Sequence, residues 1–178
     1  ARPGFRANAR DRLQAHAAGG EWDGATALAR EIAGRFRTAD RSEFVQAGWW
    51  YRHGAGSDPP AAAFVGVGSD WTRSGPAGPR IDLADYPAPE RGSFLWLATR
   101  VYSPREQPAR LEVCSRGSLQ AWQEDRLAID SSATGTFPSL SQTAVVVMRE
   151  GWNAVILRLA DWQDGDLLNV TLIPAEDR

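Results

Sequence analysis

The sequence predicts a mainly β protein, an antiparallel sandwich or barrel that follows a short helical hairpin. Up to about residue 40 the apolar residues recur at helical spacing, whereas from Phe44 onward they recur with a period of two. Turn residues separate the later apolar runs, and the helical pattern does not return. We therefore expect a helical lead-in over residues 1–40 and one β domain over residues 41–178.

Two helices are expected in the lead-in. Apolar residues at four-residue spacing run from Phe5 to Ala17, and Gly19-Gly20 ends that run. Asp23 can cap a second helix, and Trp22 stands just before this cap. The pair resembles one unit of a tetratricopeptide-type repeat, but no second copy follows. A single pair cannot bury its own apolar stripe, so we expect it to pack on the rest of the chain or on further sequence.

The β region divides into short strands. In one of them Phe94 and Trp96 face one way while Leu95 and Leu97 face the other, so this strand should be central with both faces covered. The adjacent Trp49 and Trp50 should likewise face opposite sides of their strand. The proline-rich stretch 76–92 is expected to be a long loop across one end of the sandwich. The predicted strands are 44–51, 62–67, 93–102, 109–114, 119–123, 126–130, 143–148, 153–160 and 167–173.

Composition excludes several classes of function. The net charge is −2, and the basic residues, all of them arginine, are spread evenly, so no surface for nucleic acid is expected. The longest apolar runs are far too short to cross a membrane. Cys114 is the single cysteine and cannot form an internal disulfide. The chain begins with Ala1 and shows no signal-peptide pattern, so we expect a segment of a longer protein and leave its compartment unassigned.

Two short segments accompany the predicted strands: the Tyr102-Ser-Pro104 corner and the Gly151-Trp-Asn153 turn that leads into the last long core strand. Together with these strands, they resemble the galactose-binding-like jelly-roll domain that accompanies many bacterial glycoside hydrolases. The resemblance covers roughly residues 44–173 and implies a jelly-roll β-sandwich. One departure is the hairpin turn at Gln123-Glu-Asp125, where such domains commonly carry Asn-Gly; no ligand role of that turn is carried over. Gly151 is expected to supply a positive φ, and Asn153 to bond neighbouring backbone.

No catalytic constellation is recognised, and no catalytic residue is assigned. The sequence has no Gly-x-Ser-x-Gly elbow, no His-Glu-x-x-His helix and no Cys-x-x-Cys pair. A pocket that joined His53 to Cys114 would revive an enzymatic interpretation. Asp161, Asp164 and Asp166 surround a glycine, but they lack the spacing of an EF-hand, so we expect a solvated turn and neither a metal nor another cofactor.

The 8 tryptophans supply the candidate binding residues. Exposed aromatic rings can stack on the apolar faces of sugars. Trp71 and Trp162 fall in polar loops and Trp122 precedes a hairpin turn, so these three are the predicted platforms. The sequence thus predicts a non-catalytic accessory module of a larger protein, which binds carbohydrate or positions a neighbouring hydrolase domain. The alternative is a purely structural or protein-interaction module without a sugar ligand.

Overall fold

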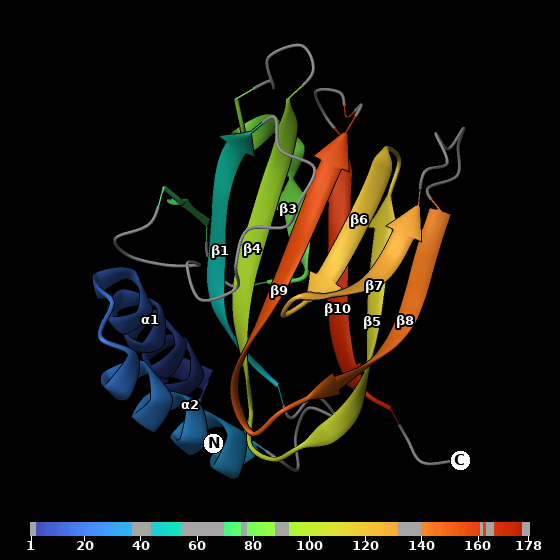
Figure 1. Ribbon diagram of the computed structural model, residues 1–178. Helices are drawn as coiled ribbons and strands as arrows, with labels where there is room; N and C mark the ends of the chain where they lie inside the picture. The colour runs from blue at the N-terminus through green and yellow to red at the C-terminus, as the bar shows by residue number, and fades with distance from the viewer. Residues whose placement is uncertain are drawn as a thin grey trace.

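Two antiparallel sheets stack face to face, and two helices lie against the outer face of the larger sheet (Figure 1). This computed structural model describes residues 3–36, 44–54, 70–75, 78–87, 93–131, 140–160, 162 and 166–175. The predicted antiparallel sandwich with an N-terminal helical pair is confirmed, and the sheets do not close into a barrel within this described part. In the same residues no helix has the length and apolar character that would let it span a membrane.

The larger sheet has six strands and the smaller has four. In spatial order the six-stranded sheet contains β2 (Thr72–Gly75), β1 (Val45–Gly54), β4 (Phe94–Ser103), β9 (Gly151–Ala160), β6 (Ser118–Gln123) and β7 (Arg126–Ser131). The four-stranded sheet contains β3 (Arg80–Asp82), β10 (Leu167–Pro174), β5 (Gln107–Ser115) and β8 (Leu140–Met148).

Most predicted strands therefore exist within a few residues of their expected bounds. The short strands β2 and β3 were not predicted, because three or four residues carry too little alternation to stand out. β3 lies within the stretch expected to be a loop, and a 3-10 turn, η2 (Leu83–Asp85), follows it. The strand predicted at 62–67 lies outside the described residues.

The core between the sheets is built from the inward side chains of both. Leu95, Leu97 and Val101 of β4 belong to it, together with Leu111 and Val113 of β5. The opposite face of β4 is also buried, because Trp96 and Ala98 pack in a second apolar cluster outside the sandwich. The prediction that this strand is central and covered on both faces is thus confirmed.

The second cluster joins the helices α1 (Pro3–Gly19) and α2 (Trp22–Phe36) to the six-stranded sheet. Leu13 and Ile32 come from the helices, and Trp50 and Ile156 come from the sheet. The hairpin therefore packs on the rest of the chain, which agrees with the expectation that its apolar stripe cannot be buried by the two helices alone. The division at residue 40 into a lead-in and a β domain stays a prediction.

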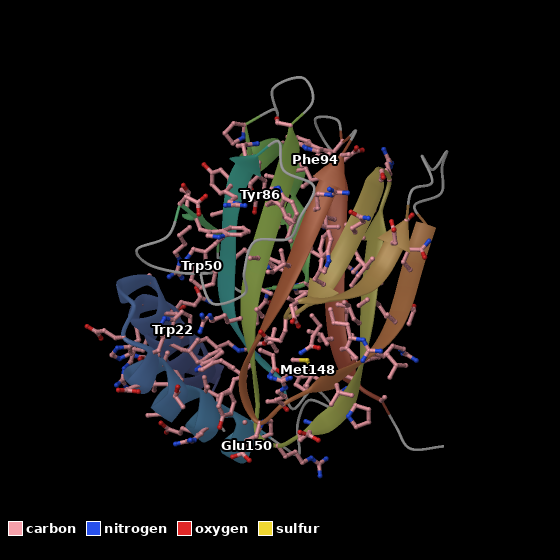
Figure 2. All side chains as sticks on the ribbon, viewed as in Figure 1. Trp22, Trp50, Tyr86, Phe94, Met148 and Glu150 are labelled. Carbon is pink, nitrogen blue, oxygen red and sulfur yellow. The ribbon has the colours of Figure 1, made fainter. Side chains whose placement is uncertain are left out.

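The link between the helices differs in detail from the expectation. Gly20 has a φ of +76°, which suits a glycine helix terminator. The predicted cap is displaced, because α2 already begins at Trp22 and Asp23 lies in its first turn. In this turn a negative charge interacts favourably with the positive end of the helix dipole. Trp22 packs across the interface, 5.4 Å from Trp152 and 6.3 Å from Trp50 by ring centroids (Figure 2).

Two turns of the sandwich are held by side chains. Gly151 has a φ of +96°, and the amide of Asn153 donates to the carbonyls of Arg149 and Gly151 while accepting from Arg149 N–H. Both predicted roles are confirmed. The glycine-free hairpin turn forces Glu124 to a φ of +55°, and its carboxylate accepts from Ala154 N–H at 2.8 Å. That bond and a second one from Glu124 N–H to Ala154 tie the turn to β9.

Candidate functional site

A recess of about 550 Å³ opens between the two sheets on the side where β10 faces β1 and β4. Its inner wall is the core face of the six-stranded sheet, with Trp49, Val101 and Val155. Its outer wall is β10 from Val170 to Ile173. A volume of this size lies within the range of small-molecule sites, so this recess is the candidate functional site. We call it the β10 recess.

The β10 recess exists because the four-stranded sheet is incomplete at this edge. β3 pairs with β10 only from Leu167 to Asn169, and Pro79 O then accepts the N–H of Val170 at 2.7 Å. Beyond that bond, no described residue continues β3 alongside β10. The core side chains opposite, Trp49, Val101 and Val155, are nevertheless buried, and the accessible part of the lining is formed by half-buried residues such as Phe44 and Leu172. Backbone direction alternates along a strand, so the N–H of Leu172 points toward the same open edge.

One wall of the recess carries a closed hydrogen-bond network. Gln46 accepts from Gly78 N–H at 2.9 Å and donates to the hydroxyl of Thr99 at 3.0 Å. Thr99 in turn donates to Gly48 O at 2.6 Å, and the indole of Trp49 donates to Gly78 O at 3.0 Å. The bulge that makes this arrangement lies between Gln46 and Trp49, where Gly48 has a φ of +124°. The network fixes the wall, and each of these bonds is made within the protein.

Arg10 is the charged residue of the lining, and it comes from the exposed face of α1. In the described part of the chain its guanidinium makes no ion pair and no hydrogen bond. The described lining holds no carboxylate, histidine or cysteine. Its polar side chains besides the indole of Trp49 are those of Arg10, Gln46, Thr99 and Thr171, which can bind and orient a ligand.

Comparison with known proteins gives a match at the level of structure only. No protein-family model and no curated protein matches the chain. The β-glucosidase from Kluyveromyces marxianus, selenomethionine-labelled, matches with a TM-score of 0.51 at 13% identity, over 74% of this chain and 17% of that chain. Its complex with glucose matches with a TM-score of 0.51 at 14% identity over the same shares. The likeness is one of fold. It covers a small part of a hydrolase chain.

Two more distant structures also match. An anti-sigma factor domain-containing protein has a TM-score of 0.47 at 9% identity, over 74% of this chain and 43% of that chain. The K3 cleaved adhesin domain of Lys-gingipain from Porphyromonas gingivalis has a TM-score of 0.36 at 16% identity, over 72% of this chain and 89% of that chain. Similarity this low bears no argument about function. The comparisons agree with a β-sandwich domain, and membership of the galactose-binding-like family stays a prediction.

The three predicted sugar platforms are buried. The residue exposures of Trp71, Trp122 and Trp162 are 7%, 5% and 8%. The expectation that these rings lie exposed on a rim is therefore wrong. Their role in binding stays a prediction.

Each ring is covered by a different neighbour. The guanidinium of Arg52 lies 5.3 Å from the Trp71 ring centre, and Trp122 packs 5.6 Å from Trp96 on the outer face of the six-stranded sheet. Trp162 closes the core between the sheets. Large indoles in loops and at strand ends can bury most of their area by folding back over neighbouring apolar surface. Trp71 and Trp122 belong to the apolar cluster on the outer face of the six-stranded sheet, whereas Trp162 belongs to the core between the sheets, so the three rings do not form one platform.

The other polar candidates do not assemble either. His53 belongs to the six-stranded sheet and Cys114 to the four-stranded sheet, so the pair that would have suggested an enzyme is absent. Asp166 is buried and lies 3.4 Å from Arg116, while Asp161 and Asp164 lie outside the described residues. Across the described ranges, no group of three or more His, Cys, Asp or Glu side chains is placed to hold a metal ion.

Proposed function

We propose that this chain is a non-catalytic accessory module of a larger protein, one that positions a neighbouring domain. The observation that carries the proposal is the fold match to a segment that makes up 17% of a β-glucosidase chain. The absence of acid, base and nucleophile from the described lining of the β10 recess supports it. So does the ordinary surface charge, which favours neither nucleic acid nor a charged lipid surface.

An uncovered sheet face is the candidate contact for the neighbouring domain. The helices cover part of the outer face of the six-stranded sheet, whereas the outer face of the four-stranded sheet carries Val145 and Val147 at 71% and 49% exposure. These two valines lie one above the other on the edge strand β8, next to β5. Exposed β-branched residues on a sheet face favour contact with another protein surface. We call the pair the β8 valines.

The test compares the isolated chain with the longest natural polypeptide that contains it. The isolated chain is expected to hydrolyse none of a panel of aryl glycosides. In the longer polypeptide we expect amide exchange at the β8 valines to be slower than in the isolated chain. Val145→Arg should remove this protection, while Thr143→Arg, also exposed on β8, serves as the matched control. Turnover by the isolated chain, or equal exchange in both forms, would contradict the proposal.

Carbohydrate binding is the second candidate function, and one observation favours it. Trp71 lies beside the ion pair between Arg52 and Asp70, whose atoms are 2.5 Å apart, so an aromatic ring and hydroxyl-binding groups adjoin one another. Affinity electrophoresis in gels that contain soluble polysaccharides tests this candidate. Retardation that is lost in Trp71→Ala, in Trp162→Ala or in Trp122→Ala would support it. Migration that no polysaccharide changes would eliminate it.

A further inference from the structure

We propose that the β10 recess binds a small amphipathic monoanion, with its apolar body between the sheets and its single carboxylate paired with Arg10. This goes beyond the accessory role proposed above, since it assigns a ligand class to a site that the tryptophan pattern did not predict. Three features carry the inference. They are the apolar wall, the closed polar network and the unpaired charge at the opening.

The wall explains the apolar body. Phe44, Leu172 and Ile173 line the recess and are half-buried, so part of their apolar surface is open to a ligand. Transfer of apolar surface out of water stabilises a complex by about 25 cal/mol per Å². The lining also contains Val101 and Val155, which are already buried in the core. A hydrocarbon or aromatic body in the recess would cover the half-buried side chains.

The polar network disfavours a polyhydroxylated ligand. The side-chain amide of Gln46 is already bonded to Gly78 and Thr99, and the Thr99 hydroxyl donates to Gly48 O. The indole N–H of Trp49 is bonded as well. A sugar would find few free partners on this wall, and breaking these bonds would cost about 1–3 kcal/mol for each buried group left unsatisfied. The network favours a ligand whose polar atoms lie at one end.

The charge explains the carboxylate. Arg10 lines the recess, is exposed and has no partner among the described residues. Its planar guanidinium matches a carboxylate in a two-bond geometry. The described lining holds no acidic side chain that would repel an anion or attract a cation. The backbone N–H of Leu172 points toward the same open edge, where no described residue of β3 pairs with it, and it is a further donor.

The test uses decanoate as the probe, with decanol and decyltrimethylammonium as matched ligands of the same chain length, all below their micellar concentrations. Isothermal calorimetry and amide chemical shifts follow the binding. We expect decanoate to bind with a stoichiometry of one and to shift the amides of Val101, Val155 and Leu172. The affinity for decanol should be about tenfold lower, because the charge-assisted pair is lost. The cation should bind more weakly still.

Three variants, one of them a control, distinguish binding in the recess from general attraction of the ligand to the protein surface. Arg10→Gln should weaken decanoate about tenfold and leave decanol unchanged, whereas Arg12→Gln, an exposed arginine on the same helix outside the lining, should change neither. Leu172→Trp fills the recess from its half-buried rim and should abolish both. Equal affinities for decanoate and decanol would overturn the proposal, as would an equal loss in both arginine variants. It would also be overturned if decanoate did not bind, or if the only shifts lay along the backbone edge of β10, as for an added peptide strand.

Discussion

Trp49 and Trp50 are consecutive residues of β1, and their rings are buried on opposite faces of the same sheet, each at 2% exposure. Trp49 belongs to the core between the sheets, and Trp50 belongs to the cluster under the helices. Adjacent strand residues point to opposite faces, so one dipeptide connects both apolar layers. The prediction that Trp49 and Trp50 face opposite sides of their strand is confirmed.

Alanine substitutions of Trp49 and of Trp50 should destabilise different parts of the chain. Trp49→Ala opens a cavity between the sheets, and Trp50→Ala opens one under the helices; each should cost about 3–5 kcal/mol of unfolding free energy. Urea denaturation measures the total loss. Hydrogen exchange shows which part of the chain is destabilised. Trp50→Ala should speed exchange mainly in α1 and α2, and Trp49→Ala should speed it mainly in β4 and β10. The same exchange pattern in both variants would contradict the separation into two layers.

Removal of the helices should expose an aromatic surface. Trp50, Tyr102 and Trp152 pack against the hairpin, and two bonds reach across: Arg30 Nε to the Tyr102 hydroxyl at 3.2 Å and Trp152 Nε1 to Thr26 Oγ1 at 2.8 Å. We expect a chain of residues 41–178 to bind a hydrophobic dye and to self-associate in light scattering. Thr26→Val removes one of these two bonds across the interface, together with the bond from the Thr26 hydroxyl to Trp22 O, and should not cause self-association. A stable, monodisperse 41–178 fragment would show that the lead-in is dispensable, in agreement with the predicted boundary.

The turn into β9 should be sensitive at two positions for different reasons. Gly151→Ala meets no atom within 4 Å, so its cost comes from the φ of +96° and should be about 1–3 kcal/mol. Asn153→Ala removes the buried amide that bonds the backbone of Arg149 and Gly151, and should cost a similar amount because three hydrogen bonds that hold the turn are lost. Thermal and urea unfolding give both values. Gly75→Ala, where the added atom also meets open space and φ is not positive, is the control and should lose less than Gly151→Ala.

Stability should fall at alkaline pH through Tyr86. Burial raises the pKa of Tyr86 above its ordinary value of 10.0; the bond to Ser74 opposes this shift, and nearby Asp85 adds to it. The neutral hydroxyl is therefore favoured in the folded state, so between the unfolded and the folded pKa the native chain holds the extra proton. The free energy of unfolding should decrease as pH rises above about 10.

The control for this prediction is Tyr86→Phe. It removes the titrating hydroxyl and leaves the ring against Tyr51, which lies 5.3 Å away. Urea midpoints between pH 8 and pH 11 should decline less steeply in the variant than in the native chain. Parallel curves for the two proteins would place the alkaline loss at other groups.

The sequence alone determined the features that depend on near neighbours. Alternation along Phe94–Ser103 predicted a strand with two buried faces, because side-chain direction in a strand follows from position parity. The Gly151 turn and the Asn153 bonds could also be predicted, because the groups that Asn153 bonds lie within four residues of it. The helical hairpin followed from spacing and from Gly20.

Only the tertiary structure decided which surfaces stay open. The loop and turn positions of Trp71, Trp122 and Trp162 suggested exposed rings, but all three are buried. Residues distant in the sequence, such as Arg52 and Trp96, pack on two of these rings, and a local sequence pattern does not report such contacts. The β10 recess brings Arg10 of α1, Thr99 of β4 and Leu172 of β10 to one place, beside the part of β10 that β3, which begins at Arg80, does not pair with. Contacts between elements that are distant in the sequence depend on how the sheets and helices pack on one another. The residues of the recess therefore come together only in the folded chain.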